Sequence, residues 1–182
     1  MKTESTVKYV LRLALTLLAI TAVVAVILAG VNSVTAPRIA ELNAEKTQAA
    51  IEAVLPGGGE EIAFTDDSGI VSTIYKGQSG YAVEVTPAGF NGTVTMMVGV
   101  DNAGKVLGIS VVNHTETAGL GAEAASQGAA GTAFRSQFTG MSGSVSVTKD
   151  GGQVDALTGA TITSRAVCTG VNAALNAVAK LG

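Results

Sequence analysis

The longest apolar run of the chain lies near its N-terminus. Residues 13–31 read LALTLLAITAVVAVILAGV and contain no charged residue. A helix needs roughly 20 apolar residues to cross a bilayer core of about 30 Å. The pattern therefore predicts a transmembrane helix, which we assign to residues 13–34.

The charges on either side of this run predict its orientation. Residues 1–12 carry three basic residues and one acidic residue, and the first basic residue after the run is Arg38. Because basic residues are retained on the cytoplasmic side, we expect residues 1–12 to be a cytoplasmic tail. The remainder of the chain is then expected outside the cytoplasm, anchored in the cell membrane by a single pass.

A cleaved signal peptide is the alternative interpretation of the same segment. The sequence VTA before Pro37 loosely resembles a cleavage site. However, the apolar run is longer than the roughly 7–15 residues of a signal-peptide core, and proline directly after a cut is an unfavourable context. The pattern favours a retained anchor.

Helical spacing continues after the apolar run. Pro37 suits a first helical turn, and Pro56 with the three glycines after it suits a helix end. Between them, one stripe recurs at intervals of three and four, formed by Ala40, Ala44, Thr47, Ile51 and Val54. We predict a linker helix over residues 35–56 that continues the membrane helix and packs against the domain that follows.

Residues 57–182 are expected to form that domain. Residues 70–77 and 81–89 alternate between apolar and polar positions, and residues 93–113 indicate a β-hairpin that turns at Asp101–Gly104. Residues 144–148, SVSVT, also alternate and predict one more strand.

Helical patterns occupy the rest of this domain. Residues 122–138 are rich in alanine and interrupted by glycine, which suggests a short helix and a loop. Residues 165–181 predict a final helix whose core-facing side carries Val167, Val171, Ala174, Leu175 and Val178. The predicted fold class is α+β, a mostly antiparallel sheet with flanking helices, preceded by one transmembrane helix.

Composition and charge narrow the possible functions. Residues 37–182 hold 8 basic and 13 acidic residues, a net charge of −5, so a nucleic-acid partner has little support. The single cysteine, Cys168, has no second cysteine with which to form an internal disulfide. It lies between Val167 and Val171 in the final helix, and we expect it to be a small buried apolar side chain.

Hydroxyl groups crowd the start of the final helix, in the sequence VDALTGATITS at residues 154–164. A helix N-terminus presents unpaired N–H groups and partial positive charge, so it favours a phosphate. Gly159 and Ala160 let the backbone approach a ligand. The simpler alternative is that Thr158, Thr161 or Thr163 caps the helix. A P-loop is excluded, because its Gly-Lys-Ser/Thr ending is missing.

A second polar and glycine-rich stretch is NHTETAGLG, residues 113–121. Its glycines allow tight turns whose N–H groups could face a ring. The alternative is an ordinary strand-exit loop with a solvated carboxylate and a surface histidine, His114. No cluster of cysteine and histidine accompanies His114, so no metal site is predicted.

Residues 155–161, DALTGAT, match the signature Asp-x-x-(Ser/Thr)-Gly-Ala-Thr of the covalent FMN-binding domain family. The resemblance implies that a flavin transferase joins FMN through its phosphate to the hydroxyl of Thr161. It also implies that the neighbouring motif residues line the cofactor site, namely Asp155, Thr158, Gly159, Ala160 and Thr163.

The second stretch is similar to the same family's Glu-Thr-Pro-Gly-Leu-Gly loop, with Ala118 in place of the proline. This resemblance implies that Glu116, Thr117, Gly119 and Leu120 are flavin neighbours. The replacement of proline by Ala118 changes the expected rigidity of the loop but not its assignment to this family motif.

The chain as a whole resembles G subunits of the Rnf electron-transport complex. The shared features are the anchor, APRIAE, GFNG at residues 89–92, the stretch GVDNAGKVLGISVVNHTETAGLG, and the flavinylation motif. The resemblance implies an electron carrier that works with other membrane subunits to exchange electrons between ferredoxin and NAD and to move Na⁺ or H⁺. No catalysis is expected from the isolated chain.

Three alternatives remain open from the sequence. The C subunit of the Na⁺-translocating NADH:quinone reductase shares the flavin domain, although it is typically longer between anchor and motif. A stand-alone anchored flavoprotein of extracellular electron transfer is the second. The third is a membrane-anchored binding or assembly module without redox activity.

Overall fold

The computed structural model describes residues 3–66 and 68–181 and divides into two compact units, Met1–Glu45 and Lys46–Gly182. The elements in chain order are α1 (Thr3–Val54), β1 (Glu60–Ile62), β2 (Val71–Lys76), β3 (Gly80–Val85), β4 (Val94–Asp101), β5 (Val106–His114), η1 (Gly121–Ala124), α2 (Ala129–Ser136), η2 (Thr148–Asp150) and α3 (Thr161–Leu181). The α+β fold class predicted from the sequence is confirmed.

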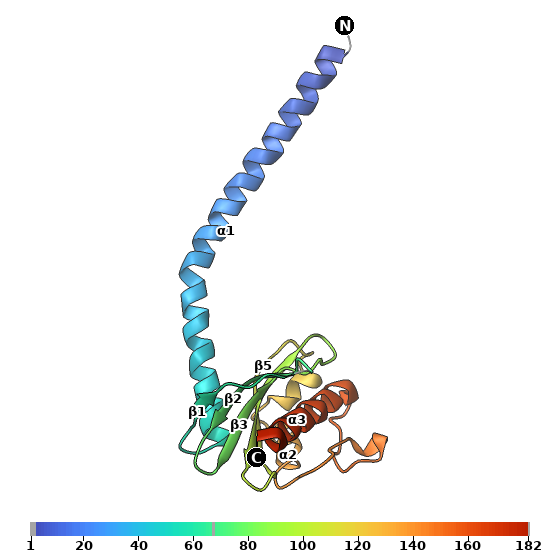
Figure 1. Cartoon of the computed structure of the whole chain (residues 1–182). Coiled ribbons are helices and arrows are strands. Elements are labelled where there is room, and N and C mark those ends of the chain that lie inside the picture. The colour runs from blue at the N-terminus through green and yellow to red at the C-terminus, as the bar shows by residue number, and fades with distance from the viewer. Residues whose placement is uncertain (1–2, 67, 182) are drawn as a thin grey trace. The chain divides into compact units, whose positions relative to one another are not determined.

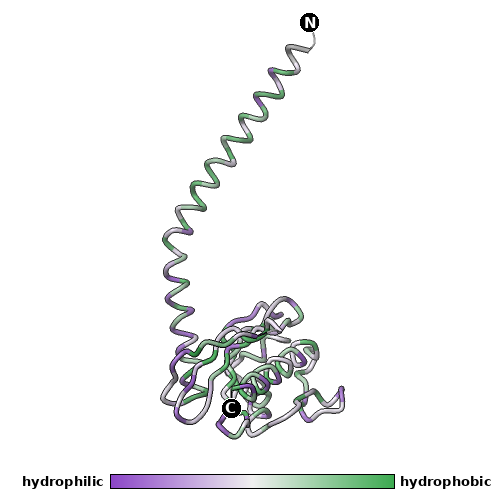
Figure 2. The backbone as a smooth tube through the Cα atoms, viewed as in Figure 1, coloured by the Kyte–Doolittle hydropathy of each residue, from purple (hydrophilic) through white to green (hydrophobic). Residues whose placement is uncertain are grey.

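The first unit consists of the greater part of α1, whose apolar side chains are exposed from Val7 to Leu42. Figure 2 shows the apolar colouring that runs along this part of the helix. Within the described residues, α1 is the helix that is long and apolar enough to span a membrane. Pro37 does not lie in a first helical turn, as its residue type suggested, but inside α1, which runs through both the predicted membrane segment and most of the predicted linker segment. There the ring removes one backbone hydrogen bond, and the helix continues on both sides.

The second unit is built on one antiparallel sheet in the order β1-β2-β3-β4-β5 (Figure 1). Strands β2 to β5 lie within the predicted segments or extend at most one residue beyond them, whereas β1 was not predicted. The β4–β5 turn forms where expected, because Asp101 Oδ1 accepts hydrogen bonds from the N–H groups of Ala103 and Lys105, both at 2.8 Å. This carboxylate fixes the hairpin register.

The two faces of the sheet bury different helices. On one face, Val83, Met96 and Val98 pack against α3, which contributes all five of the predicted core residues. On the other face, Ala82 and Met97 pack against the last turns of α1, at Ala50, Ile51 and Val54. Each fully buried valine or methionine contributes roughly 1.5–3 kcal/mol, so the sheet fixes α3, including its N-terminus.

The segment SVSVT does not form the strand that its alternation predicted. Val145 and Val147 are buried, which explains the alternation, but Val145 pairs with the side-chain amide of Asn172 on α3 and not with the sheet. Val147 forms a single parallel bridge with Val154. The segment therefore lies along α3 and leads into η2.

Gly99 gives a prediction for the contact between sheet and α1. A Cβ at Gly99 would lie 2.3 Å from the backbone oxygen of Val54, a rigid neighbour. We expect Gly99→Ala to lower the free energy of unfolding by about 1–3 kcal/mol, as overpacking does. Gly108, its cross-strand partner, has nothing within 4 Å of the same position, so Gly108→Ala is the matched control. Thermal unfolding measures both, and equal melting temperatures would contradict the packing.

Candidate functional site

A pocket of about 320 Å³ lies at the N-terminus of α3. It is lined by Phe90, Glu116, Thr117, Leu120, Gly121, Lys149, Gly159, Ala160, Thr161, Ile162 and Thr163. Seven of the ten residues that the sequence singled out therefore come together, although they come from two separate loops and the first turn of α3. Such a volume lies at the lower end of the range for small-molecule pockets.

The turn before α3 places the motif. Gly159 has a φ of +74°, in the left-handed region that favours glycine, and the chain then enters the helix at Thr161. The Ser164 hydroxyl accepts a hydrogen bond from the Leu157 N–H at 3.0 Å and donates one to the Ala160 oxygen at 2.9 Å. Ser164 is completely buried. It fixes the turn and so fixes the position of Thr161.

The capping alternative is wrong for two of the threonines. Ala160 directly precedes the helix, so Thr161 and Thr163 lie inside it. Each hydroxyl has a different partner: Lys149 Nζ donates to Thr161 Oγ1 at 3.2 Å, and Thr163 Oγ1 donates to Glu116 Oε2 at 2.5 Å. Thr158 is exposed before the helix.

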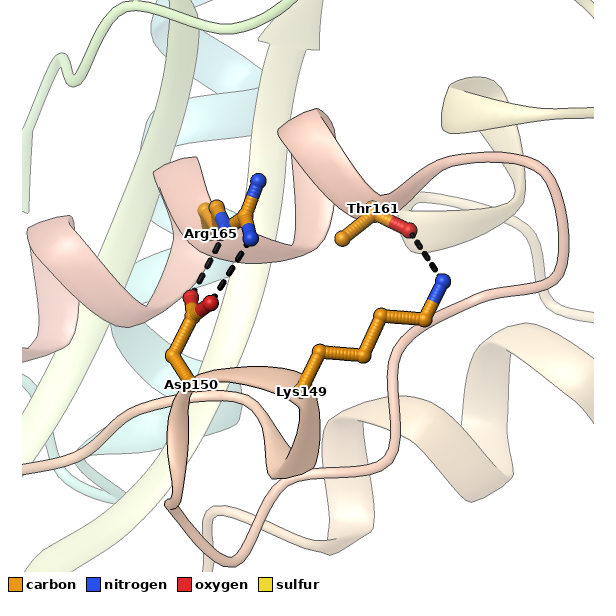
Figure 3. A network of polar contacts seen from close by, with 4 residues as sticks. All are labelled: Lys149, Asp150, Thr161 and Arg165. Atoms are coloured by element: carbon orange, nitrogen blue, oxygen red, sulfur yellow. Dashed lines mark hydrogen bonds and ion pairs between the residues drawn. The ribbon is translucent and has the colours of Figure 1, made fainter.

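A small polar network surrounds Thr161 (Figure 3). Lys149 and Asp150 both belong to η2, which lies beside the first turns of α3. Asp150 accepts two hydrogen bonds from Arg165, each of 2.7 Å, in a bidentate ion pair. This bonding lowers the pKa of Asp150. Of the two cations in this network, Lys149 contacts the Thr161 hydroxyl and Arg165 is paired with Asp150.

Glu116 is a buried carboxylate, 8% exposed, beneath the pocket. Burial by itself would raise its pKa, but hydrogen bonds from Thr163 and from the N–H groups of Asn91 and Phe90 outweigh burial, so the pKa lies below its ordinary value. The N–H of Phe90 donates to Oε1 at 2.9 Å and that of Asn91 at 3.0 Å. A single charged side chain therefore joins the 89–92 loop, the 115–121 loop and α3.

Gly121 allows this close approach. A Cβ there would lie 2.5 Å from both Glu116 Oε2 and Thr163 Oγ1. Gly121 was not among the predicted site residues.

The mouth of the pocket is apolar. Beyond residue 56, the described residues expose five large apolar side chains, which are Phe90, Leu107, Leu120, Ile162 and Leu181. Phe90, Leu120 and Ile162 all line this pocket, with exposed fractions of 67%, 43% and 48%. An exposed apolar cluster beside a polar, cationic end suits a ligand with a flat apolar ring and an anionic tail.

Three predicted residues lie outside the pocket. Gly119, Asp155 and Thr158 line a neighbouring hollow of about 330 Å³, together with Glu123 and Leu120. Gln137 holds the backbone of Asp155 through two hydrogen bonds, of 2.8 and 3.2 Å, and Asp155 is exposed. Two larger hollows, of about 630 and 580 Å³, lie along the C-terminal half of α3 and contain none of the ten predicted site residues.

His114 differs from the surface histidine that the sequence favoured. It ends β5 opposite Val94 and is half-buried, and its Nδ1 atom is buried without a hydrogen-bond partner among the described residues. Phe90, Lys149 and Ile162 line the pocket but were not predicted. Phe90 lies in the GFNG stretch of the family resemblance, whereas nothing in the local sequence marks Lys149.

Cys168 is buried, as expected, with 4% of its surface exposed. Burial raises the pKa of its thiol to about 11, and only the thiolate is a strong nucleophile. We therefore expect Cys168 to resist a maleimide reagent at pH 7.5 in the folded protein and to react fully in denaturant. Rapid modification of the folded protein would contradict this burial.

Comparison with known proteins defines first the class of domain. Residues 89–176 match the FMN-binding domain family, and residues 1–54 match the RnfG N-terminal region. The first match covers the pocket and both loops that form it. The chain therefore contains an FMN-binding domain behind an N-terminal region of the RnfG type.

Individual relatives then define the family. The chain is 36% identical to the G subunit of the Na⁺-translocating ferredoxin:NAD⁺ oxidoreductase complex of Acetobacterium woodii, over 91% of this chain and 89% of the relative. It is 32% identical to the G subunit of the ion-translocating oxidoreductase complex of Methanosarcina acetivorans, over 94% and 95%. The G subunit of the proton-translocating ferredoxin:NAD⁺ oxidoreductase complex of Clostridium ljungdahlii is 39% identical over 54% of this chain and 52% of the relative.

The chain belongs to the family of G subunits of Rnf-type ion-translocating oxidoreductase complexes. Its FMN-binding domain makes it a flavin-dependent electron-transfer subunit. The resemblance recognised in the sequence is confirmed. The matches favour this family over the quinone reductase C subunit and the stand-alone flavoprotein, and they argue against a module without redox activity.

Proposed function

We propose that this subunit carries FMN in a phosphoester bond to Thr161 and passes electrons between other subunits of its complex. The observation that carries the proposal is the position of the Thr161 hydroxyl, which lines an apolar-rimmed pocket at a helix N-terminus and accepts a hydrogen bond from Lys149. The flavin ring suits the rim, and the phosphate suits the cationic end. The flavin supplies one- or two-electron redox chemistry when bound.

The surroundings of the hydroxyl groups favour Thr161 over its neighbours. Thr163 is 1% exposed, and its hydroxyl is bonded to Glu116. Ser164 is completely buried and bonded to Ala160. Thr158 is exposed but belongs to the neighbouring hollow. Thr161 combines partial exposure, a place in the pocket and an adjacent cation.

Asp155 and Thr158 have a separate part in the proposal. Because both line the adjoining hollow and are exposed, they are accessible to the flavin transferase during attachment. In this view they contact the enzyme that attaches FMN and not the attached flavin ring.

The length of α1 and its flanking charges support a membrane arrangement. We propose that α1 spans the cell membrane with residues 1–12 in the cytoplasm and the flavin domain outside. A covalent bond then has a clear advantage, because weakly bound FMN would be lost by dilution into an open compartment. By analogy with the named relatives, the whole complex transfers electrons between ferredoxin and NAD⁺ and translocates Na⁺ or H⁺.

Two measurements test this function. The full chain, produced with and without a flavin transferase, is analysed by mass spectrometry and by fluorescence in a denaturing gel. One FMN mass added only in the presence of the transferase supports the proposal, and no adduct with an active transferase would contradict it.

A protease added to intact spheroplasts should digest the flavin domain, whereas its full protection would overturn the topology.

A further inference from the structure

We propose that Lys149 binds the phosphate of the FMN ester at Thr161 and that the Asp150–Arg165 ion pair holds Lys149 in position. This inference rests on the proposed attachment at Thr161. It gives a binding role to Lys149, an exposed lysine outside the flavinylation motif, and a positioning role to Asp150 and Arg165.

The backbone around Lys149 is well anchored. Lys149 lies two residues after Val147, which is completely buried, and the Thr148 N–H donates to the Val154 oxygen at 2.8 Å. The Asp150 N–H donates to the Val147 oxygen at 2.9 Å. The short η2 segment therefore has a fixed backbone, although its side chains are exposed.

Two side-chain contacts connect η2 to successive turns of α3. Arg165 lies four residues after Thr161, so both face the same side of the helix. Asp150 pairs with Arg165, and the adjacent Lys149 contacts Thr161 (Figure 3). The ion pair thus sets the register in which Lys149 meets the hydroxyl.

The charges suit a phosphate bound at this point. A phosphodiester carries one negative charge, and the Lys149 ammonium already donates to the oxygen that would become the ester oxygen. Its flexible stem allows the same group to reach oxygens bonded to the adjoining phosphorus. Arg165 neutralises Asp150, whose carboxylate would otherwise attract Lys149 away from the phosphate.

Attachment requires an FMN donor whose phosphate is part of an anhydride, such as FAD. The Thr161 oxygen forms a bond to the FMN phosphorus, and the anhydride P–O bond breaks. The leaving nucleotide phosphate takes the electron pair, and the hydroxyl proton passes to a base of the transferase or to water. No electrons are transferred in this step, and Lys149 contributes only its positive charge.

The test compares variants of the full chain in detergent. Each variant is incubated with a purified flavin transferase and FAD. Initial rates of adduct formation are measured by mass spectrometry at low and high salt. We expect Lys149→Ala to load at least about fivefold more slowly and to lose most of the salt sensitivity of the unaltered chain. Lys149→Arg should retain most of the rate. Lys180→Ala, which removes an exposed cation near the other end of α3, is the matched control.

The positioning role is tested by Arg165→Ala, alone and combined with Lys149→Ala. Alone it should slow loading, and in the combination it should add nothing further, because both changes act through the same contact. After prolonged loading, the ³¹P resonance of the ester should differ between the Lys149→Ala variant and the unaltered chain. This signal reports on the attached phosphate and not on docking of the transferase.

The outcomes separate the two proposals. No adduct on the unaltered chain contradicts attachment itself. An adduct that forms equally fast in Lys149→Ala, or that is not rescued by Lys149→Arg, overturns the inference about charge. An unchanged ³¹P resonance in the loaded variant overturns phosphate binding by Lys149. A melting temperature equal to that of the unaltered chain shows that the slower loading does not arise from unfolding.

Discussion

Replacing Thr161 by alanine is expected to remove all covalently attached flavin from the chain. The reason is chemical, since alanine has no oxygen to form the ester. The expected loss is complete, whereas folding should be little affected, because among the described residues the Thr161 hydroxyl makes one hydrogen bond, with the exposed Lys149 at the pocket surface. Mass spectrometry after co-production with a flavin transferase measures the adduct, and thermal unfolding measures the fold.

Two conservative replacements serve as controls. Thr161→Ser keeps a hydroxyl at the same position and should still be loaded. Thr163→Ser keeps the hydroxyl that donates to Glu116 and should be loaded like the unaltered chain. Serine is a better control at this position than alanine, because alanine would leave Glu116 without one of its three hydrogen bonds.

The two possible contrary results have different meanings. Flavin retained on Thr161→Ala, with peptide mapping to Thr158 or Thr163, would show that the transferase uses another hydroxyl. Loss of flavin from Thr161→Ser would show that the methyl group of threonine is required. Either result leaves family membership intact, because that rests on the sequence matches.

Much of the fold was predictable because its signals are local. Strands β2 to β5 are six to nine residues long and rich in β-branched side chains, and the Asp101–Gly104 turn is specified by its own residues. The failures lie where a distant contact decides the local structure. Val145 and Val147 alternate like a strand, but the amide of Asn172 on α3 takes both backbone groups of Val145.

The site likewise contains residues that local sequence predicts and residues that only distant contacts reveal. The motif around Thr161 is contiguous and can be recognised in the sequence, whereas Lys149 stands 12 residues earlier in an ordinary glycine-rich turn. The partners of Glu116 lie between 25 and 47 residues away along the chain. Resemblance pointed to Glu116 as a flavin neighbour, but only the fold reveals that its oxygens are occupied by the protein's own donors.

Replacing Glu116 by alanine is therefore expected to destabilise the flavin domain strongly. The change leaves the N–H groups of Phe90 and Asn91 and the hydroxyl of Thr163 without their acceptor. Each lost hydrogen bond to a charged group typically costs about 1.5–3 kcal/mol. Because water can enter from the pocket, we expect a total loss of about 2–4 kcal/mol in the free energy of unfolding, measured by chemical denaturation. Glu116→Gln keeps one carbonyl acceptor, so its free energy of unfolding should decrease clearly less than that of Glu116→Ala.

The pH dependence of stability provides a second measurement for the same carboxylate. Its hydrogen bonds hold the pKa of Glu116 below its ordinary value of 4.5 in the folded protein. The stabilising contribution is therefore fully present above that ordinary value and is lost as pH falls through the folded-state pKa.

Asp66, whose pKa is lowered to about 2 mainly by its hydrogen bond with Ser68, also loses a stabilising contribution in acid. The difference between the unaltered chain and Glu116→Gln removes the contribution of Asp66. We expect that difference to shrink as pH decreases below 4.5, because protonation turns Glu116 into a neutral group like glutamine. A difference that stays constant from about pH 7 to about pH 3 would show that the charge of Glu116 does not hold the three segments together.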